Sequence, residues 1–531
     1  MKRRTAAFFA VFMVGMFLMI MKVYGISTGE QLAETADKQS TYELKVAQTR
    51  GMIYDCNLKP LVGRESEYIA AVSPTTQAAN ALAKTLPQEE MAKVYNILTQ
   101  GKPFAWKVPD GGISAEGMDV FRISKRYSGN QIASNVIGYL DGSGAGVAGI
   151  EKAYNDYLTS DPGFITVKYK VDAVNRVLQG EGRKVENTYD KEKSGVVLTL
   201  DAEIQEKAEE LARDYLPKGT VIVTEVSTGK IRAMVSMPTF SPNDISSALE
   251  NPDAPLMNRA LAGYNVGSVF KLVSAAAALE AGISPEEEYT CKGGIEVSGD
   301  MFHCFDGIAH GTVSMQEAVA QSCNAYFIQL MQQVPADRFL AMASSLGFGK
   351  SFEIAPGIVS KAGILPTANE LKIEKALANL SFGQGTLMVT PLQVSGLIGC
   401  IANNGIYLQP TLIEGLVDKE LDFTERTQEK AGKRVMSEDT AVQLKEFMAA
   451  SVDHGTSRKG RPLLGMAGAK TGTAQTGEII DSREVIQAWF AGFYPLNEPE
   501  YAIVILGEDE PGGGGVCAPI FKELTDWLAL R

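Results

Sequence analysis

Histidine is scarce in this sequence, which has three histidines in 531 residues: His303, His310 and His454. A Ser-His-Asp triad, or a metal site built on several histidines, would have to draw on this small set. None of the three stands in a recognisable metal spacing such as HExxH. If this protein performs nucleophilic chemistry, a group other than histidine therefore has to move the proton.

Cysteine is also sparse. Six cysteines are too few for a disulfide framework at this length, and none forms a CxxC pair, which argues against a zinc site. Cys291 and Cys304 are the nearest pair in sequence, and a disulfide between them stays open. The neighbouring His303 and His310 could complete a metal site with these two cysteines, but local packing and turn formation is the favoured role for both histidines. The six are Cys56, Cys291, Cys304, Cys323, Cys400 and Cys517.

Basic residues are outnumbered: 50 lysines and arginines stand against 63 aspartates and glutamates, for a formal net charge of -13. No basic patch stands out against this acidity, which argues against nucleic acid as a partner. With 45% hydrophobic and 21% charged residues, the composition is that of a folded protein. A length of 531 residues predicts two or three domains.

Only one stretch is apolar for long enough to cross a bilayer, the uncharged run from Thr5 to Met21. A cleaved signal peptide is the alternative, but the run exceeds the usual apolar core of a signal and no clear small-x-small cleavage site follows it. Basic residues at positions 2–4 predict that residues 1–4 form a cytoplasmic tail. Residues 5–22 are therefore predicted to be a single-pass membrane anchor, with everything after about residue 23 outside the cytoplasmic membrane.

Changes of pattern divide the rest of the chain. Residues 23–45 are polar and favour a linker, and residues 46–190 mix short strand-like runs with turns, which predicts an irregular α+β region. The polar, lysine-containing segment 180–195 is typical of a hinge. Beyond it, residues 196–216 predict a strand followed by a helix that is capped by Asp201.

Two pairs of β-rich runs bracket a helix-rich stretch in the second half. Residues 219–238 hold two runs joined by Ser-Thr-Gly, and residues 485–509 hold a second pair around Leu-Asn-Glu-Pro-Glu. Residues 268–450 lie between the pairs and favour helices, and an amphipathic helix over 518–530 closes the chain. Distant strands that bracket a helical insert predict one antiparallel sheet with helices packed around it, an α+β domain over residues 191–531.

Three short motifs carry the candidate chemistry. A serine and a lysine three residues apart begin an alanine-rich helical sequence, so their side chains can share one helix face. Taken alone, this pair could be an ordinary helix start with a capping serine. The triplets Ser-Cys-Asn and Lys-Thr-Gly follow, and the order SxxK, SxN, KTG makes the set specific where each motif alone is weak. The residues are Ser268, Lys271, Ser322, Asn324, Lys470, Thr471, Gly472 and Thr473.

The chemistry of a serine nucleophile explains this choice of residues. Serine is a poor nucleophile at neutral pH and needs a neighbouring base. A lysine amine can serve as that base if burial and a nearby positive charge lower its pKa, and Lys470 could supply the charge for Lys271. Ser268 at a helix N-terminus would also place its backbone N–H where a developing oxyanion can be held.

This motif set resembles that of the penicillin-binding proteins and serine β-lactamases. The segment at 49–64, "TRGMIYDCNLKPLVGR", is similar to one found early in the class B, monofunctional members, and the resemblance continues through "STGKIRAMVSMPTFSPN" and "SFGQGTLMVTPLQ". The chain is thus identified as a class B penicillin-binding protein, a D,D-transpeptidase. The resemblance implies a transpeptidase/β-lactamase-like domain over 191–531, preceded by an elongated, non-catalytic α+β pedestal over 46–190 and a single transmembrane helix.

The resemblance also implies a role for each motif residue. Ser268 would attack a stem peptide with Lys271 as its base, and Ser322 would relay a proton between Lys271 and the leaving amine. Asn324 would hold a substrate amide. The strand that carries KTG would be a sheet edge on which an extended peptide can pair, and Gly472 would leave room for that approach. Lys470, Thr471 and Thr473 would hold the substrate carboxylate, and the Thr473 N–H would be the second oxyanion donor.

The implied function is the cross-linking of peptidoglycan stem peptides, with covalent inhibition by β-lactams and with neither a cofactor nor a metal. The resemblance implies a polytopic glycosyltransferase and its morphogenesis or division complex as partners, and no glycosyltransferase region is apparent in the chain itself. Elongation, division and sporulation all stay open. Two alternatives remain: a β-lactamase or D,D-carboxypeptidase of the same superfamily, or a catalytically inactive cell-wall scaffold.

Of two residues near the motifs, one departs from the family pattern and one occupies its variable position. Val266 stands where the family usually has a proline before the glycine and serine, which removes rigidity from the turn but leaves the nucleophile and base in place. Cys323 puts a thiol between Ser322 and Asn324, and a small buried side chain is the favoured interpretation.

Overall fold

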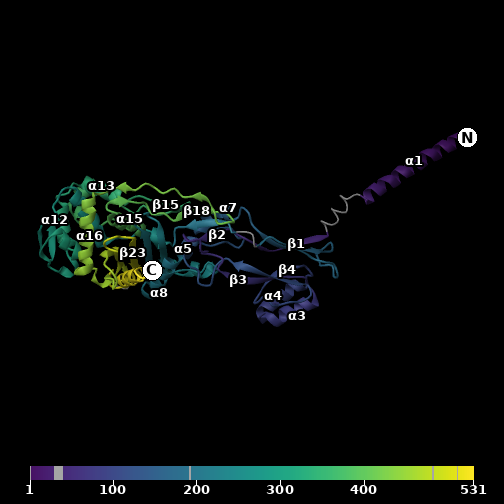
Figure 1. Cartoon of the computed structure of the whole chain (residues 1–531), viewed down its shortest axis with the longest axis horizontal. Coiled ribbons are helices and arrows are strands. Elements are labelled where there is room, and N and C mark those ends of the chain that lie inside the picture. Colours follow the sequence, from purple (N-terminus) through teal and green to yellow (C-terminus); the bar gives the residue numbers. More distant parts are fainter. Residues whose placement is uncertain (1, 29–39, 190–192, 481–482, 511) are drawn as a thin grey trace. The chain divides into compact units, whose positions relative to one another are not determined.

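The computed structural model describes residues 2–28, 40–189, 193–480, 483–510 and 512–531 (Figure 1). The chain forms two compact units. The first comprises Met1–Arg50, Gly63–Arg126 and Asp161–Glu192, and the second comprises Gly51–Val62, Tyr127–Ser160 and Lys193–Arg531. Each unit is described by itself.

The first unit begins with α1 (Lys2–Ser27), whose side chains are all exposed. This helix is long and apolar enough to cross a membrane, and it extends beyond the predicted span 5–22 at both ends. It also takes in residues 23–27 of the predicted linker, while residues 41–45 lie in a strand. Residues 29–39 of the linker lie outside the described part of the chain.

Among the residues that the structure describes, the rest of the first unit consists of two antiparallel sheets and two helices, in agreement with the predicted α+β content. One sheet has the order β1-β6-β7 and the other β4-β3-β5. Helices α3 (Thr76–Thr85) and α4 (Gln88–Leu98) share an apolar core with the second sheet. The strands are β1 (Thr41–Gln48), β3 (Glu65–Val72), β4 (Phe104–Val108), β5 (Met118–Lys125), β6 (Phe164–Lys170) and β7 (Lys184–Asn187).

The division between the units differs from the predicted boundary at residues 190 and 191. Strand β2 (Met52–Tyr54) pairs in parallel with β8 (Gly195–Leu198), which ties the segment 51–62 to the second unit. Residues 127–160, predicted to lie in the pedestal, also belong to the second unit. The predicted hinge is in part a strand, because β7 pairs with β6, and residues 190–192 of that hinge lie outside the described residues.

A five-stranded antiparallel sheet organises the second unit, with the order β10-β9-β23-β22-β21. Its strands are β9 (Gly219–Glu225), β10 (Ile231–Met237), β21 (Gly468–Ile480), β22 (Arg483–Tyr494) and β23 (Tyr501–Glu508). Pairing of β9 with β23 joins the two strand pairs that bracket the helical insert, so the prediction of one antiparallel sheet is confirmed.

Alternating residues of the sheet pack against helices on both faces. Ala488 and Phe490 pack with α8 (Ala202–Tyr215) and α17 (Cys517–Leu528). Trp489 and Ala491 pack with α10 (Lys271–Glu280), α15 (Pro391–Ala402) and α16 (Glu438–Asp453). This period of two is the pattern that a sheet buried on both faces requires. The predicted cap is confirmed, because the Asp201 side chain accepts hydrogen bonds from the first N–H groups of α8.

The remaining elements of the second unit surround this sandwich. A four-stranded sheet has the order β19-β18-β8-β2. The short helices are α5 (Ser134–Ile137), α6 (Gly149–Ala153), α7 (Asn155–Leu158), α9 (Ile245–Glu250), α11 (Met315–Ala320), α12 (Asn324–Met331), α13 (Ala336–Ser345) and α14 (Glu374–Ser381). The short strands are β11 (Tyr289–Cys291), β12 (Gly294–Val297), β13 (Asp300–His303), β14 (Gly311–Val313), β15 (Glu353–Ala355), β16 (Ile358–Val359), β17 (Ile406–Tyr407), β18 (Ile413–Val417), β19 (Phe423–Arg426) and β20 (Lys433–Arg434).

A buried ion pair fastens the segment before Ser268 to the sheet. Arg259 is 1% exposed, and its Nε donates to Glu508 Oε1 on β23 at 2.9 Å. The Tyr264 hydroxyl donates to the same carboxylate oxygen at 2.6 Å. Charge-assisted hydrogen bonds of this kind are short and geometrically specific, so they hold this segment in register with β23.

Candidate active site

Ser268 lies on a tight turn at the start of α10. The turn is a 3₁₀-helix, η3 (Gly267–Phe270), in which the Lys271 N–H donates to the Ser268 carbonyl. Gly267 has φ +58°, in the left-handed region that favours glycine, and its N–H donates to Gly383 O at 3.0 Å. The sequence Val-Gly-Ser therefore places the serine at the tip of a turn whose backbone is fixed by a distant segment.

The turn approaches strand β21 too closely for side chains on either backbone. A Cβ on Gly267 would lie 2.6 Å from the Thr473 carbonyl, and a Cβ on Gly472 would lie 2.8 Å from the Val266 carbonyl. We predicted that Gly472 leaves room for a substrate, whereas its free space is taken by the turn and by Trp489. The glycine of KTG thus brings the nucleophile to the strand that carries the motif.

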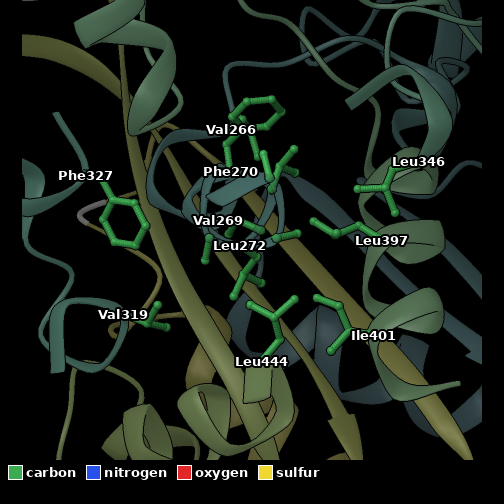
Figure 2. Close-up of a cluster of buried hydrophobic side chains, with 14 of the residues drawn as sticks. Val266, Val269, Phe270, Leu272, Val319, Phe327, Leu346, Leu397, Ile401 and Leu444 are labelled. Carbon is green, nitrogen blue, oxygen red and sulfur yellow. The ribbon is translucent and has the colours of Figure 1, made fainter. Parts of the chain in front are cut away.

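Apolar residues of the core pack against the turn that carries Ser268. Figure 2 shows Val266, Val269 and Phe270 in one buried cluster, with Phe327 to one side and Leu397 to the other. Val266, which replaces the usual proline, is 1% exposed and belongs to this core. Burial of its side chain fixes the turn in place of the rigidity that a proline ring would supply.

Lys271 is fully buried and directs its amine toward the SxN segment. Its Nζ donates to Asn324 Oδ1 and to the Ser322 carbonyl at 2.6 Å each, and to Ser322 Oγ at 3.1 Å. The same nitrogen lies 5.9 Å from the centre of the Phe327 ring. Burial lowers the pKa of Lys271 from its ordinary value of 10.5 to about 7, against a smaller raising effect of the Cys323 and Cys304 thiols. A neutral amine is therefore accessible near neutral pH.

Lys470 brings a second buried amine to the same hydroxyl. It lies on β21, the edge strand of the sheet, as predicted for KTG. Its Nζ donates to Ser322 Oγ at 2.9 Å and to the Thr471 carbonyl at 3.0 Å. Burial, and next the charge of Lys271, hold the pKa of Lys470 well below its usual value. Two ammonium charges this close in a dry site repel each other, which favours a state with at most one of them protonated.

Ser322 sits between the two amines in a strained conformation. Its φ is +59°, a region that non-glycine residues rarely occupy and that recurs at functional sites. A hydroxyl has one proton and two lone pairs, so it can accept from one amine while it donates to the other when that amine is neutral. The geometry therefore permits a proton to pass between Lys271 and Lys470 through Ser322.

The Ser268 hydroxyl has no hydrogen-bond partner among the residues that the structure describes. We expected Ser268 and Lys271 to touch, but the hydrogen bonds of the lysine amine go to Ser322 and Asn324 instead. Ser268 as a residue is partly buried. No hydrogen bond within the described residues therefore competes for the Ser268 hydroxyl, while the SxN segment holds the amine of Lys271.

The remaining motif residues line the same region. The Asn324 amide donates from Nδ2 to the His303 carbonyl at 2.8 Å, so it links Lys271 to the segment around His303. Thr471 Oγ1 donates to Thr456 Oγ1 at 2.8 Å. The backbone of Thr473 lies beside Gly267, the residue before Ser268.

Sequence reasoning missed several residues that position the turn. Asn265 is held by β22 at both backbone groups: its N–H donates to Gln487 Oε1 at 2.6 Å, and its carbonyl accepts from Trp489 Nε1 at 2.8 Å. Gly383 also has no room for a side chain, since a Cβ there would lie 2.0 Å from the Gly267 carbonyl. Gly383 belongs to "SFGQG", which was noticed in the sequence without a role, whereas Gln487 and Trp489 gave no signal.

Four side chains beside the site could hold a metal ion. The thiols of Cys291, Cys304 and Cys323 and the ring of His310 bring one ligand atom each to within 4.8 Å of one another. The disulfide that stayed open between Cys291 and Cys304 is not formed, because their sulfurs are 3.6 Å apart and all six cysteines are free. His303 lies outside this cluster of four.

Comparison with known proteins identifies a family domain in the second unit. Residues 219–526 match the family described as the penicillin binding protein transpeptidase domain. Over 408 residues the chain is 32% identical to the peptidoglycan D,D-transpeptidase PbpA of Mycolicibacterium smegmatis, which covers 70% of this chain and 82% of that protein. It is 28% identical to stage V sporulation protein D of Bacillus subtilis over 98% of this chain and 84% of that protein.

Solved structures show the same likeness. Penicillin binding protein 3 from Mycobacterium tuberculosis, in complex with aztreonam, matches with a TM-score of 0.66 at 26% identity, over 92% of this chain and 97% of that one. A chain from a peptidoglycan synthase complex shares the fold with a TM-score of 0.68 at 24% identity, over 98% of this chain and 97% of that one.

Substitution of Gly472 by alanine tests the close approach of the turn to β21. The new Cβ would overlap the Val266 carbonyl, so we expect Gly472→Ala to lower the free energy of unfolding by about 1–3 kcal/mol. Gly399→Ala is the matched control, because that position in α15 has open space and a helical alanine should stabilise by about 0.5–1 kcal/mol. Urea unfolding followed by tryptophan fluorescence measures both, and equal stability of the two variants would contradict the close approach.

Proposed function

Because this chain belongs to the class B penicillin-binding proteins, we propose that Ser268 is the serine that carries the acyl group in its reaction. The chain is a peptidoglycan D,D-transpeptidase, a serine-type acyl-transfer enzyme. The observation that carries the assignment of roles is the Ser322 hydroxyl, which accepts hydrogen bonds from the amines of both Lys271 and Lys470. Lys271, one of these two amines, lies three positions after Ser268, whose hydroxyl has no hydrogen-bond partner among the described residues.

In the first half of the reaction, Ser268 Oγ attacks the carbonyl of the penultimate D-alanine of a stem peptide. The neutral amine of Lys271 takes the hydroxyl proton as the O–C bond forms. The backbone N–H groups of Ser268 and Thr473 hold the oxyanion of the tetrahedral intermediate. The C–N bond to the terminal D-alanine then breaks, and its nitrogen receives a proton that passes from Lys271 by way of Ser322.

In the second half, an amine from a neighbouring strand attacks the acyl-Ser268 ester. The new C–N bond is the cross-link, and Ser268 Oγ leaves with a proton that the attacking amine has given up. Proton movement runs through Ser322 in the opposite direction, as microscopic reversibility requires. Two amines of lowered pKa around one hydroxyl allow the proton to pass in either direction, because neither transfer requires a charged group to move into water.

The edge position of β21 supports a binding mode for the peptide. An extended stem peptide would add to the free edge next to Lys470, Thr471 and Thr473, with main-chain hydrogen bonds to the strand. Its terminal carboxylate would be held by the amine of Lys470 and the hydroxyls of Thr471 and Thr473. Asn324 would hold an amide of the substrate while it keeps Lys271 in position.

The protein is membrane-anchored through α1. We further propose that it crosses the membrane once, with residues 1–4 in the cytoplasm and the part of the chain after α1 on the opposite side, where peptidoglycan lies. Lys2, Arg3 and Arg4 support this direction, because basic residues remain on the cytoplasmic side. A polytopic glycosyltransferase within a morphogenesis or division complex is the proposed partner, since cross-linking needs newly polymerised strands.

The acyl-enzyme provides the test of this function. The full-length protein in detergent, treated with benzylpenicillin, should gain the mass of one penicilloyl group on the peptide that contains Ser268. The adduct should survive for many minutes, because it blocks the acceptor and no residue is assigned to activate water against it. Ser268→Ala should abolish the adduct, while Ser246→Ala, at an exposed serine in α9, should keep it.

Two outcomes would contradict the proposal. Regeneration of free enzyme within seconds would favour the β-lactamase or carboxypeptidase alternative. Absence of any adduct from the folded protein would favour a scaffold without catalysis.

Lys271→Arg tests whether that lysine acts as a neutral base. Arginine keeps the charge but cannot lose its proton at working pH, so acylation by penicillin should fall by at least about a hundredfold with little change in melting temperature. Lys372→Arg, at an exposed lysine, should acylate normally. In the unmodified protein the neutral fraction of Lys271 increases as pH rises through about 7, so the acylation rate should climb below that pH and level off above it. A rate independent of pH, or an active arginine variant, would mean that the lysine acts by charge alone.

Reporter fusions test the direction of insertion. Alkaline phosphatase joined after residue 30 should be active in intact cells, because it folds only outside the cytoplasm, and a green fluorescent protein at the same point should be dark. The reverse pair of signals would place the bulk of the chain in the cytoplasm.

A further inference from the structure

Three cysteines and one histidine converge in the second unit from four separate places in the chain. Cys291 ends strand β11, Cys304 follows β13, His310 precedes β14, and Cys323 caps the N-terminus of α12. β11 and β14 are antiparallel partners, which brings Cys291 opposite Gly311, the neighbour of His310. The folding of residues 291–323 therefore brings these four side chains together, although no local sequence motif indicates it.

Three distances between ligand atoms in the cluster are close to those of a tetrahedral metal site, and all four atoms lie within 4.8 Å of one another. Cys291 Sγ lies 3.6 Å from Cys304 Sγ and 3.4 Å from His310 Nδ1, and Cys304 Sγ lies 3.9 Å from Cys323 Sγ. Zinc bonds of about 2.3 Å to sulfur and about 2.0 Å to nitrogen separate the ligand atoms of a tetrahedron by roughly 3.5–3.8 Å. We propose that Cys291, Cys304, His310 and Cys323 bind one structural Zn²⁺ ion.

The chemistry of the ligands favours zinc among the common ions. Three thiolates and an imidazole form a soft, closed set with no open position for water, whereas Mg²⁺ and Ca²⁺ prefer oxygen. The three cysteines are at most 2% exposed. Each thiol that binds gives its proton to solvent, so loading releases up to three protons and leaves a cluster of net charge −1.

Backbone N–H groups are aimed at the sulfurs. The Gly293 N–H donates to Cys291 Sγ, and the Tyr326 N–H, in the first turn of α12, donates to Cys323 Sγ, both at 3.4 Å. Such donors stabilise thiolate charge and orient metal ligands. Gly293 has no room for a side chain, because a Cβ there would lie 2.3 Å from the Gly307 carbonyl.

The surrounding segment has little apolar core of its own. Residues 289–313 form two small two-stranded sheets, and the large apolar side chains of Met301, Phe305 and Ile308 are exposed. Short segments that bury so little surface are commonly held together by a metal or by disulfides. A zinc ion would bind both sheets to the start of α12 at one point.

The cluster is connected to the SxN residues. Cys323 lies between Ser322 and Asn324, and the Asn324 amide donates to the carbonyl of His303, the neighbour of Cys304. A zinc ion that fixes Cys304 and Cys323 would therefore hold Ser322 in its left-handed conformation and Asn324 against Lys271. This consequence rests on the proposed function, whereas the zinc site itself does not.

Metal content of the full-length protein is the direct test. After purification in detergent without chelators, the protein should contain about one zinc ion per chain by mass spectrometry of the elements, and loss of zinc on treatment with a mercurial should follow thiol modification. His310→Ala should weaken zinc binding by about 10–100-fold, and His310→Cys should restore it by supplying a fourth thiolate. His303→Ala and Cys400→Ser are matched controls outside the cluster and should keep the ion.

Cobalt substitution keeps the test independent of variants that fail to fold. The unmodified protein loaded with Co²⁺ should show thiolate-to-cobalt charge transfer and the intense visible bands of a tetrahedral site. Less than about a tenth of a metal ion per chain, with Cys291 and Cys304 recovered as a disulfide-linked pair, would overturn the proposal. Zinc that stays bound with unchanged affinity in His310→Ala would overturn it too.

Penicillin acylation after chelation of zinc separates two claims, the zinc site itself and its effect on Ser322 and Asn324. Slower acylation that zinc restores would support the link to Ser322 and Asn324. Zinc content that responds to the variants as expected, with acylation unchanged by chelation, would keep the site and overturn only that link. Failure of acylation in the zinc-loaded, unmodified protein would count against the proposed function and leave the metal site standing.

Discussion

Two buried lysine amines share one serine hydroxyl, and the rest of the site depends on this arrangement. Lys271 and Lys470 are both removed from water, and their Nζ atoms lie 3.1 and 2.9 Å from Ser322 Oγ. Burial lowers the pKa of each amine, and the charge of Lys271 further lowers that of Lys470. In a protein with three histidines, this is how a serine can obtain a base near neutral pH.

The surrounding fold excludes water from the two lysine amines and holds them close together. Lys470 lies on the edge strand of the five-stranded sheet, and Lys271 lies at the start of a helix packed on one face of that sheet. Gly267 and Gly472 allow the turn and the strand to meet without side chains between them. On the other flank, Arg259 and Tyr264 bind the preceding segment to Glu508 of β23. Backbone contacts and buried charges therefore set the spacing that the chemistry needs.

Strand pairs and caps were predictable because their signals are local. The two β-rich pairs, the antiparallel sheet and the Asp201 cap follow from periodicity and capping chemistry within a few residues, and the structure confirms them. The extent of the units was not predictable in the same way. The pairing of β2 with β8 joins residues separated by more than a hundred positions, and no local pattern in residues 46–62 indicates it.

The sequence by itself determined which side chains are available: a serine–lysine pair, an SxN triplet and a KTG triplet in that order, with three histidines in the whole chain. Their order was enough to identify the family. Only the tertiary structure decided what these groups contact. It directs Lys271 to Ser322 and Asn324 rather than into a hydrogen bond with Ser268, gives the space beside Gly472 to the nucleophile turn, and gathers three cysteines and His310 without any CxxC motif. The reason is physical: residue types fix what chemistry a chain can perform, whereas distances between remote groups arise only when the chain buries its apolar surface.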